Sequence, residues 1–363
     1  RGKAMGTWAG VSGMALAVGP VLGGLLTEHV SWRAIFYINI PVAVGAVLAT
    51  LFAVRESRDT SVGREVDVPG VAVLTGALTA LVLALIEGNA WGWGSPRIVL
   101  LLVGAALGLA AFAVVERRVK ATIVQFELLS DRNFLAAVVV ALIITFAMMG
   151  VFFFLALYMQ NILHYTPLEA GIRFLPSTAM IVALAPIAGR LSDRCGPRWL
   201  IAGGLTVVAI SLYSFHDIGV DSGYGDLLPG FMMLGIGIAL TMSPMTSAAM
   251  NAVPVQKAGV ASGVLSMFRM VGGSLGVAVT GAIFQSLASS RLSELLAGSG
   301  VSAAERERIA DGLHGGGSEA LAGVGGAAGA VQDAAAEAFV YALGNAMSVS
   351  AAIALAGSAI AAV

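Results

Sequence analysis

The chain has very little charge for its length. Only 11% of its 363 residues are Asp, Glu, Lys or Arg, whereas a soluble domain has about 25%. Apolar residues make up 58% of the chain, and its mean hydropathy is +0.90. No water-soluble fold of this length has an interior large enough to bury so much apolar surface. The sequence therefore predicts an integral membrane protein and excludes soluble enzymes and nucleic-acid-binding proteins as first interpretations.

Other absences exclude further classes of protein. The single cysteine, Cys195, excludes an intrachain disulfide framework and a cysteine-rich metal site. The four histidines are scattered without metal-ligand spacing, and a net charge of −1 gives no bulk attraction to nucleic acid. The sequence also has no Gly-x-x-x-x-Gly-Lys-Ser/Thr loop for a nucleotide and no set of nucleophile, base and orienting acid. We therefore expect no enzyme activity, no cofactor, no metal and no nucleic-acid partner.

The charged residues leave long intervals of the chain free of Asp, Glu, Lys and Arg. A transmembrane helix needs about 20 apolar residues to cross roughly 30 Å of hydrocarbon, and ten intervals meet or approach this length. The predicted spans are 4–27, 34–54, 68–86, 98–115, 133–168, 174–189, 199–216, 227–256, 258–290 (interrupted only by Arg269) and 338–363. Because such lengths exceed those of barrel strands, the sequence predicts an all-α protein with ten transmembrane helices.

Lys and Arg are concentrated on one side of the membrane in this arrangement. With Arg1 in the cytoplasm, the loops on that side hold 13 of these residues, against three in the short loops on the other side and Arg291 at the edge of a longer one. Because cytoplasmic loops carry the excess of Lys and Arg, we expect both chain ends to be cytoplasmic. One external loop, 288–337, is long and rich in Ala and Gly. We interpret it as a partly helical external loop, with a site for a periplasmic adaptor protein as the alternative.

The first predicted span contains small residues at helical spacing around a proline. Pro20 cannot donate a hydrogen bond to the carbonyl oxygen of Leu16, so the helix should bend there. Gly19, Gly23 and Gly24 allow another membrane helix to approach closely. We expect these residues to form a close-packed seam in which a leucine at Gly23 pushes the neighbouring helix away. A purely structural packing face is the alternative.

The loop after the sixth span combines charges with glycine and proline. Arg190 is expected at a helix C-terminus and Asp193 before the next helix N-terminus, where their charges are favourable. Gly196 permits a sharp reversal, and Asp193 can pair with Arg190 or Arg198. We interpret the loop as a latch between helices, and a plain positive-inside loop is the alternative. The latch residues are Gly189, Arg190, Asp193, Arg194, Gly196 and Arg198.

These two segments resemble signatures of one transporter superfamily. Gly19-Pro20-x-x-Gly23-Gly24 resembles the antiporter motif in the fifth helix of major facilitator drug exporters. Gly189-x-x-x-Asp193-Arg194-x-Gly196-Pro197-Arg198 resembles the second copy of that superfamily's cytoplasmic loop signature. Further matching segments are Trp32 to Pro41, Asp67 to Gly70, Pro167 to Gly171 and Arg269 to Gly276. With the extra spans 68–86 and 98–115, they are similar to the fourteen-helix drug:proton antiporters of the EmrB/QacA type.

The resemblance implies a major facilitator fold that lacks its first four helices. Residues 1–54 would be the last two helices of the N-terminal bundle, 55–133 an inserted helix pair with a cytoplasmic linker, and 134–363 the C-terminal six-helix bundle. The implied function is proton-driven efflux of small hydrophobic or cationic drugs or natural products across the bacterial inner membrane by alternating access. A dedicated exporter of one metabolite and a truncated membrane protein that transports nothing are the alternatives.

Ionisable groups inside the membrane are candidates for proton coupling. All 21 acidic residues lie outside the predicted spans, and Asp67, Glu87 and Glu169 are among those directly at a span end. We therefore expect the proton-carrying acid in the four helices that the resemblance implies before Arg1. The clear intramembrane charge is Arg269, roughly 16 Å from the cytoplasmic edge at 1.5 Å per residue. A structural or gating role is expected for it, and direct proton or substrate coupling is the alternative.

The resemblance also implies that spans 134–160 and 227–249 face a central cavity. Met side chains repack around varied ligands and aromatic faces attract cations, so such residues suit lipophilic and cationic substrates. Packing against lipid or against other helices is the alternative for each of them. The candidate cavity residues are Phe146, Met149, Phe153, Met242 and Met245.

Overall fold

The computed structural model describes residues 2–53, 67–116, 126–298 and 328–362, and all regular elements in these ranges are helical. The predicted linker segments 54–66 and 117–125 and the loop segment 299–327 lie outside the described residues. The main helices are α1 (Gly2–His29), α2 (Ala34–Tyr37), α3 (Asn39–Ala53), α4 (Val68–Trp91), α5 (Pro96–Glu116), α6 (Phe126–Leu129), α7 (Arg132–Asn161), α8 (Pro167–Arg173), α9 (Leu175–Cys195), α10 (Pro197–Ser214), α11 (Tyr224–Asn251), α12 (Ala258–Leu295) and α14 (Ala328–Ala362).

The predicted all-α membrane fold is confirmed. Within the described ranges, eight helical segments are long and apolar enough to cross a membrane. Helices α1 and α10 lie where the sequence predicts two further spans. Each predicted span therefore coincides with one helix or, for 34–54, with the consecutive helices α2 and α3.

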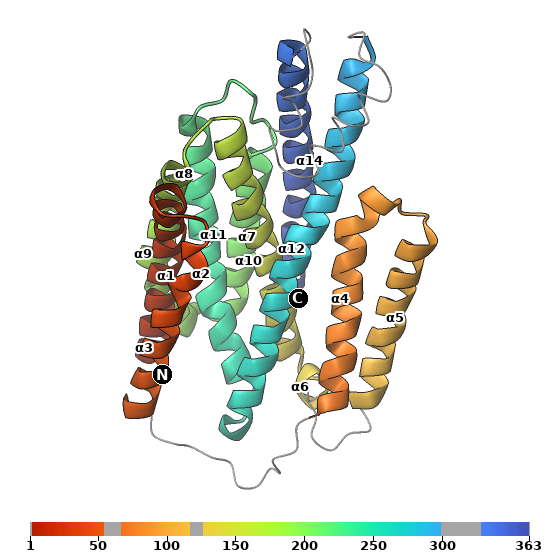
Figure 1. The fold of residues 1–363 in the computed structure, drawn as a ribbon. Coiled ribbons are helices and arrows are strands. Elements are labelled where there is room, and N and C mark those ends of the chain that lie inside the picture. The colour runs from red at the N-terminus through yellow and green to blue at the C-terminus, as the bar shows by residue number, and fades with distance from the viewer. Residues whose placement is uncertain (1, 54–66, 117–125, 299–327, 363) are drawn as a thin grey trace.

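The helices form a bundle with two flanking groups (Figure 1). The bundle contains α7, α9, α10, α11, α12 and α14, and α1 lies along one side of it against α8 and α9. The antiparallel pair α4 and α5 stands on the other side, where α4 packs against α12. No residue of Asn39–Ala53 is buried, so α3 presents its whole apolar surface outward.

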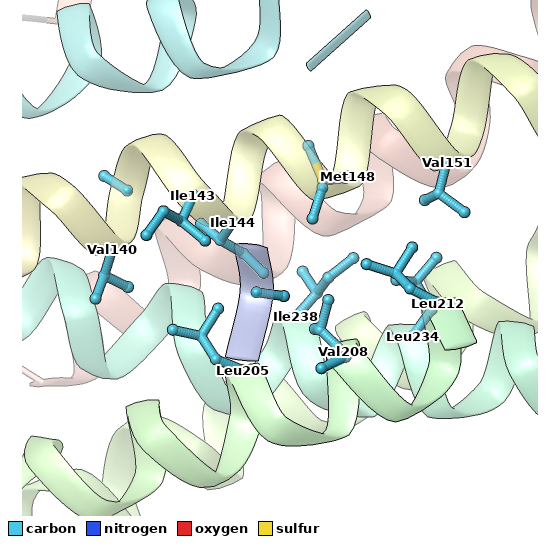
Figure 2. Close-up of a cluster of buried hydrophobic side chains, with 14 of the residues drawn as sticks. Val140, Ile143, Ile144, Met148, Val151, Leu205, Val208, Leu212, Leu234 and Ile238 are labelled. Atoms are coloured by element: carbon cyan, nitrogen blue, oxygen red, sulfur yellow. The ribbon is translucent and has the colours of Figure 1, made fainter. Parts of the chain in front are cut away.

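Helix α7 is the centre of the core. Its sequence is apolar on every side, as expected for a helix surrounded by other helices. Figure 2 shows its side chains meeting leucine, valine and isoleucine side chains of α10 and α11. The labelled members of this cluster are Val140, Ile143, Ile144, Met148 and Val151 of α7, Leu205, Val208 and Leu212 of α10, and Leu234 and Ile238 of α11.

Aspartate side-chain caps fix where two of these helices begin. Asp131 accepts hydrogen bonds from the backbone N–H groups of Asn133 and Phe134, at 2.9 and 3.0 Å, and starts α7. Asp67 accepts one from Gly70 at 2.8 Å and starts α4, and the carboxylate occupies the place that a Cβ at Gly70 would need. The Asp67 to Gly70 motif is thus an N-terminal cap with a glycine that makes room for it.

The structure shortens the predicted external loop 288–337 at both ends. Helix α12 continues to Leu295 and α14 begins at Ala328, so the two helices extend past the other helices as a pair (Figure 1). Arg291 binds Glu294 at 2.9 Å and Glu337 at 2.8 Å. A second small core between the two helices consists of Leu292, Leu296, Val331, Ala335 and Ala338. A charge such as Arg291 ends the hydrocarbon-crossing part of a helix but not the helix itself.

Candidate functional site

Helix α1 passes the short helix α8 so closely that only glycine fits at two positions. A Cβ on Gly24 would lie 2.5 Å from the carbonyl oxygen of Pro167 and 2.7 Å from Cα of Leu168. A Cβ on Gly171 would lie 2.8 Å from the carbonyl carbon of Pro20. These neighbours are backbone atoms, so no side-chain rotation can relieve the clash. We call this contact of Pro20 and Gly24 with Pro167, Leu168 and Gly171 the α1–α8 seam.

The seam joins two of the segments that carry the family resemblance, but it does not use every glycine of the first one. A Cβ on Gly19 or Gly23 would have no heavy atom within 4 Å. Among the described residues it is therefore Gly24, and not Gly23 as expected, at which a larger side chain would push a neighbouring helix away. Consecutive helical residues point about 100° apart, and the crossing of α1 over α8 directs Gly24 rather than Gly23 at the neighbour.

The first turn of α8 binds the C-terminal end of α1. Thr166 and Glu169 form a capping box, with hydrogen bonds of 3.0 and 3.2 Å. The Glu28 carboxylate of α1 accepts a hydrogen bond of 3.3 Å from the backbone N–H of Leu168. An anion is favourable at a helix N-terminus, so Glu28 supports the seam electrostatically.

The other end of α8 is held by aromatic side chains. The Arg173 guanidinium lies 3.6 Å from the centre of the Tyr165 ring and 5.6 Å from that of Tyr224 on α11. The Tyr224 hydroxyl also donates a hydrogen bond of 2.9 Å to the carbonyl oxygen of Arg173. Sequence reasoning missed this cluster, because Tyr224 is distant from Arg173 in the sequence and only the fold brings the two together. Helix α8 is therefore clamped between α1 and α11.

The predicted latch is arranged differently from the expectation. Helix α9 continues through Cys195, so Arg190, Asp193 and Arg194 lie on its last turns rather than in a loop. Among the residues that the structure describes, Asp193 forms no ion pair with Arg190 or Arg198. Arg198 instead stacks on Trp199, 5.3 Å from the ring centre, and donates to the carbonyl oxygen of Ala362. A latch role for these charges stays a prediction.

Two glycines of the latch segment have clear structural roles. A Cβ on Gly189 would lie 2.9 Å from Oγ of Ser243, so Gly189 lets α9 approach α11. Gly196 has φ +81° and ψ 154° and forms the whole connection between α9 and α10. Other residues rarely adopt this backbone conformation, so the sharp reversal depends on glycine.

Gly196→Ala should lower the free energy of unfolding by about 1–3 kcal/mol, because it forces a Cβ into a backbone region that is nearly glycine-only. Gly203→Ala on α10 is the matched control, because a Cβ there has no heavy atom within 4 Å and alanine favours helix. Thermal unfolding of both variants in detergent tests this. Equal unfolding temperatures for Gly196→Ala and Gly203→Ala would contradict the role of Gly196.

Arg269 lies on α12 and is half-buried. In the described part of the chain it has neither a hydrogen bond nor an ion pair. Gly272 and Gly276, on the next two turns, pack directly on the α7 backbone at Leu142 and Phe146. Arg269 therefore precedes a rigid helix crossing, and its expected gating or structural role stays a prediction.

The five candidate cavity residues do not share one surface. Phe146 is 5% exposed and Met245 is fully buried, and Met242 is partly buried against the same core. Met149 and Phe153, by contrast, are exposed. The expectation that all five line a cavity is corrected for Phe146 and Met245, which pack inside the bundle. Phe146 is covered because α12 crosses α7 at its backbone, and periodicity along one helix does not show where another helix crosses.

Comparison with known proteins gives one consistent picture. The model of the Major Facilitator Superfamily matches residues 1–277. The chain is 36% identical over 283 residues to the tetracenomycin C resistance and export protein of Streptomyces glaucescens, a match that covers 78% of this chain and 53% of that protein. It is 38% identical to the puromycin resistance protein pur8 of Streptomyces alboniger, over 77% of this chain and 56% of that protein.

A third curated relative and a solved structure agree with these matches. The multidrug resistance protein Stp of Mycobacterium tuberculosis (strain ATCC 25618 / H37Rv) is 33% identical over 80% of this chain and 54% of its own length. The chain thus spans about half the length of the curated relatives it matches. A bacterial homologue of the human lysosomal transporter Spinster, inward-facing and occupied, has a TM-score of 0.52 at 17% identity, over 99% of this chain and 85% of that chain. At this identity the structural match shows the fold alone.

Proposed function

The chain belongs to the Major Facilitator Superfamily and is a multi-pass membrane transporter, and from this premise we propose that it exports small hydrophobic or cationic compounds in exchange for protons. The proposed substrates are drugs or natural products, because the matched relatives are named as resistance and export proteins. We place the transporter in the bacterial inner membrane, in the fourteen-helix branch of the EmrB/QacA type.

The α1–α8 seam is the observation that carries this proposal. In the proposed architecture, residues 1–54 end the N-terminal bundle, 55–133 hold the inserted pair α4 and α5, and 134–363 form the C-terminal bundle. The seam then joins the two bundles that rock against each other during alternating access. Because glycine contacts backbone atoms in this seam, the two helices can separate and come together again without any interdigitated side chains having to change rotamer. Such a surface suits a moving interface.

A dedicated exporter of one natural product is the second candidate function. The relative from Streptomyces glaucescens, named for tetracenomycin C alone, favours it. A membrane protein that transports nothing is the third possibility. The breadth of protection in living cells separates the three.

We expect the protein, expressed from its own gene in a drug-sensitive bacterial host, to raise the inhibitory concentration of several unrelated lipophilic antibiotics at least fourfold. Empty vector and a Gly24→Leu variant serve as controls. Protection against only one of the compounds would contradict multidrug export and favour a dedicated exporter of one natural product. Normal membrane levels without protection against any compound would contradict export altogether.

The proposed orientation predicts that Cys195 is reached only from the cytoplasm. Cys195 is exposed and is the only cysteine in the sequence, so the unmodified protein carries its own reporter. A membrane-impermeant maleimide should label Cys195 in everted inner-membrane vesicles. It should not label Cys195 in intact cells whose outer membrane has been permeabilised. Asp221→Cys in a Cys195→Ser background should show the opposite pattern, because Asp221 is exposed in the connection between α10 and α11. Labelling of Cys195 from outside would overturn the orientation.

A further inference from the structure

A pocket separate from the α1–α8 seam lies between α4, α7 and α12. Its volume is about 680 Å³, within the range of ligand pockets in proteins. Its lining is mostly apolar, with Phe153 and Phe154 from α7 and Phe284 from α12, and Glu87 and Gln285 supply polar groups. Helix α4, which forms one wall of the pocket, stands on the opposite side of the bundle from α1 (Figure 1).

Glu87 is the unusual member of this pocket. The sequence places it at the end of a span, but α4 continues to Trp91, which leaves Glu87 about one turn inside the helix. It is half-buried, and within the described ranges it forms neither an ion pair nor a hydrogen bond. An acid inside a membrane helix is costly unless it faces a cavity or a cation. The described residues supply no cation to this carboxylate.

The walls of the pocket are fixed by contacts between the helices. Asn89 of α4 donates hydrogen bonds to the carbonyl oxygen of Ala282 at 2.8 Å and to Oε1 of Gln285 at 3.1 Å, both on α12. Trp93 Nε1 donates to Asn89 Oδ1 at 2.7 Å, which holds the Asn89 amide in place. These bonds tie the end of α4 that carries Glu87 to α12. The part of the α4 backbone that carries Glu87 is therefore held beside the pocket that this residue lines.

The aromatic wall is equally well supported. The ring centre of Phe154 lies 5.1 Å from those of both Phe153 and Phe284, and Phe284 lies 4.9 Å from Phe339 of α14. Aromatic faces attract organic cations, especially where water is excluded. A pocket lined by aromatic rings and by a carboxylate to which the described residues give no counter-ion is thus complementary to a ligand that is both apolar and positively charged.

The pocket also has an access route along the bundle. A second pocket of about 480 Å³ runs between α4 and α12 and shares Val82, Ile86 and Ser274 with the first. It is bordered by Met270, which is 77% exposed. The groove therefore opens sideways at the surface of the described helices beside Met270.

We propose that this pocket binds a lipophilic organic cation, with Glu87 as its counter-charge and Phe153, Phe154 and Phe284 as its aromatic contacts. This deepens the proposed function, on which it rests for the class of compound, and assigns Phe153, until now a candidate for the cavity between the two bundles, to a binding place beside α4. A bound ligand supplies the positive charge that the described protein does not place beside Glu87.

The test is equilibrium binding of tetraphenylphosphonium to the purified chain in detergent. Glu87→Gln keeps the shape and removes the charge, and we expect it to weaken binding at least tenfold, with several-fold weakening for Phe153→Ala. Glu87→Asp should retain most of the affinity, because it keeps the charge. Asp217 is an exposed acid on the connection between α10 and α11, so the control variant Asp217→Asn should bind tetraphenylphosphonium like the parent. Unchanged thermal unfolding of Glu87→Gln shows that its loss of binding is not a folding defect.

Neutral triphenylphosphine separates charge from apolar contact, because its binding should not respond to Glu87→Gln. Equal affinity of parent and Glu87→Gln for tetraphenylphosphonium would overturn the proposal. A phospholipid that remains bound in native mass spectrometry and is not displaced by tetraphenylphosphonium would overturn it as well. Glu87-dependent binding in a protein that gives cells no drug tolerance would support this site and contradict the proposed export function, so the two failures are distinguishable.

Discussion

Replacing Gly24 by leucine should reduce export at least tenfold, whereas the same change at Gly23 should leave export close to that of the parent. A Cβ at position 24 would lie 2.5 Å from the carbonyl oxygen of Pro167 and 2.8 Å from the backbone nitrogen of Leu168. Overpacking costs about 1–3 kcal/mol. A transporter whose conformations differ by a few kcal/mol responds strongly to a change of that size. Even Gly24→Ala should be impaired.

Gly23→Leu is the matched control because it changes the same type of residue on the same helix by the same volume. At position 23 a Cβ has no heavy atom within 4 Å. Rates of substrate efflux and membrane levels should be measured for both variants. If Gly24→Leu exports as fast as Gly23→Leu at equal protein levels, the α1–α8 seam has no role in transport.

Gly276→Val should prevent stable assembly of the C-terminal bundle. A Cβ at Gly276 would lie 2.8 Å from the Cα and carbonyl carbon of Phe146, and one at Gly272 would lie 2.8 Å from Cα of Leu142. The α7 backbone cannot move away, because α7 is buried among the other helices. We expect a loss of at least about 3 kcal/mol, the upper end of usual overpacking costs, and little folded protein.

Gly263→Val is the control for this second prediction. It lies on the same helix, has no heavy atom within 4 Å of its Cβ and carries the same change in helix propensity. Size-exclusion chromatography and thermal unfolding in detergent report the folded fraction of both variants. Equal stability of Gly276→Val and Gly263→Val would show that the crossing of α7 and α12 tolerates a wider spacing.

The membrane helices could be predicted from the absence of charge, since hydrocarbon excludes Asp, Glu, Lys and Arg. Their ends could not, because a charge stops the hydrophobic segment without stopping the helix. Glu87 therefore lies inside α4, Asp193 lies on the last turns of α9, and Arg291 lies on an extended α12. At each of these places the helix continues past the end of the uncharged segment.

The candidate site could be predicted as motifs but not as contacts. The glycine motif of α1 and the Pro167 to Gly171 segment were both visible in the sequence, and the structure brings them together. The choice of Gly24 over Gly23 depends on the angle at which α1 crosses α8. The burial of Met245 likewise depends on neighbouring helices and not on its own helix. Helix crossing angles and burial against neighbouring helices depend on the tertiary structure, so they could not be predicted from the pattern along one helix.

Substrate-driven proton movement in proteoliposomes tests the central claim, proton-coupled export, most directly. The protein expressed from its own gene is reconstituted with an acidic interior, and a lipophilic cation is added outside while the internal pH is recorded. The account predicts that the substrate accelerates collapse of the pH gradient in the parent and in Gly23→Leu, and fails to do so in Gly24→Leu. A pH gradient that every tested substrate leaves unchanged in folded, reconstituted parent protein would contradict it.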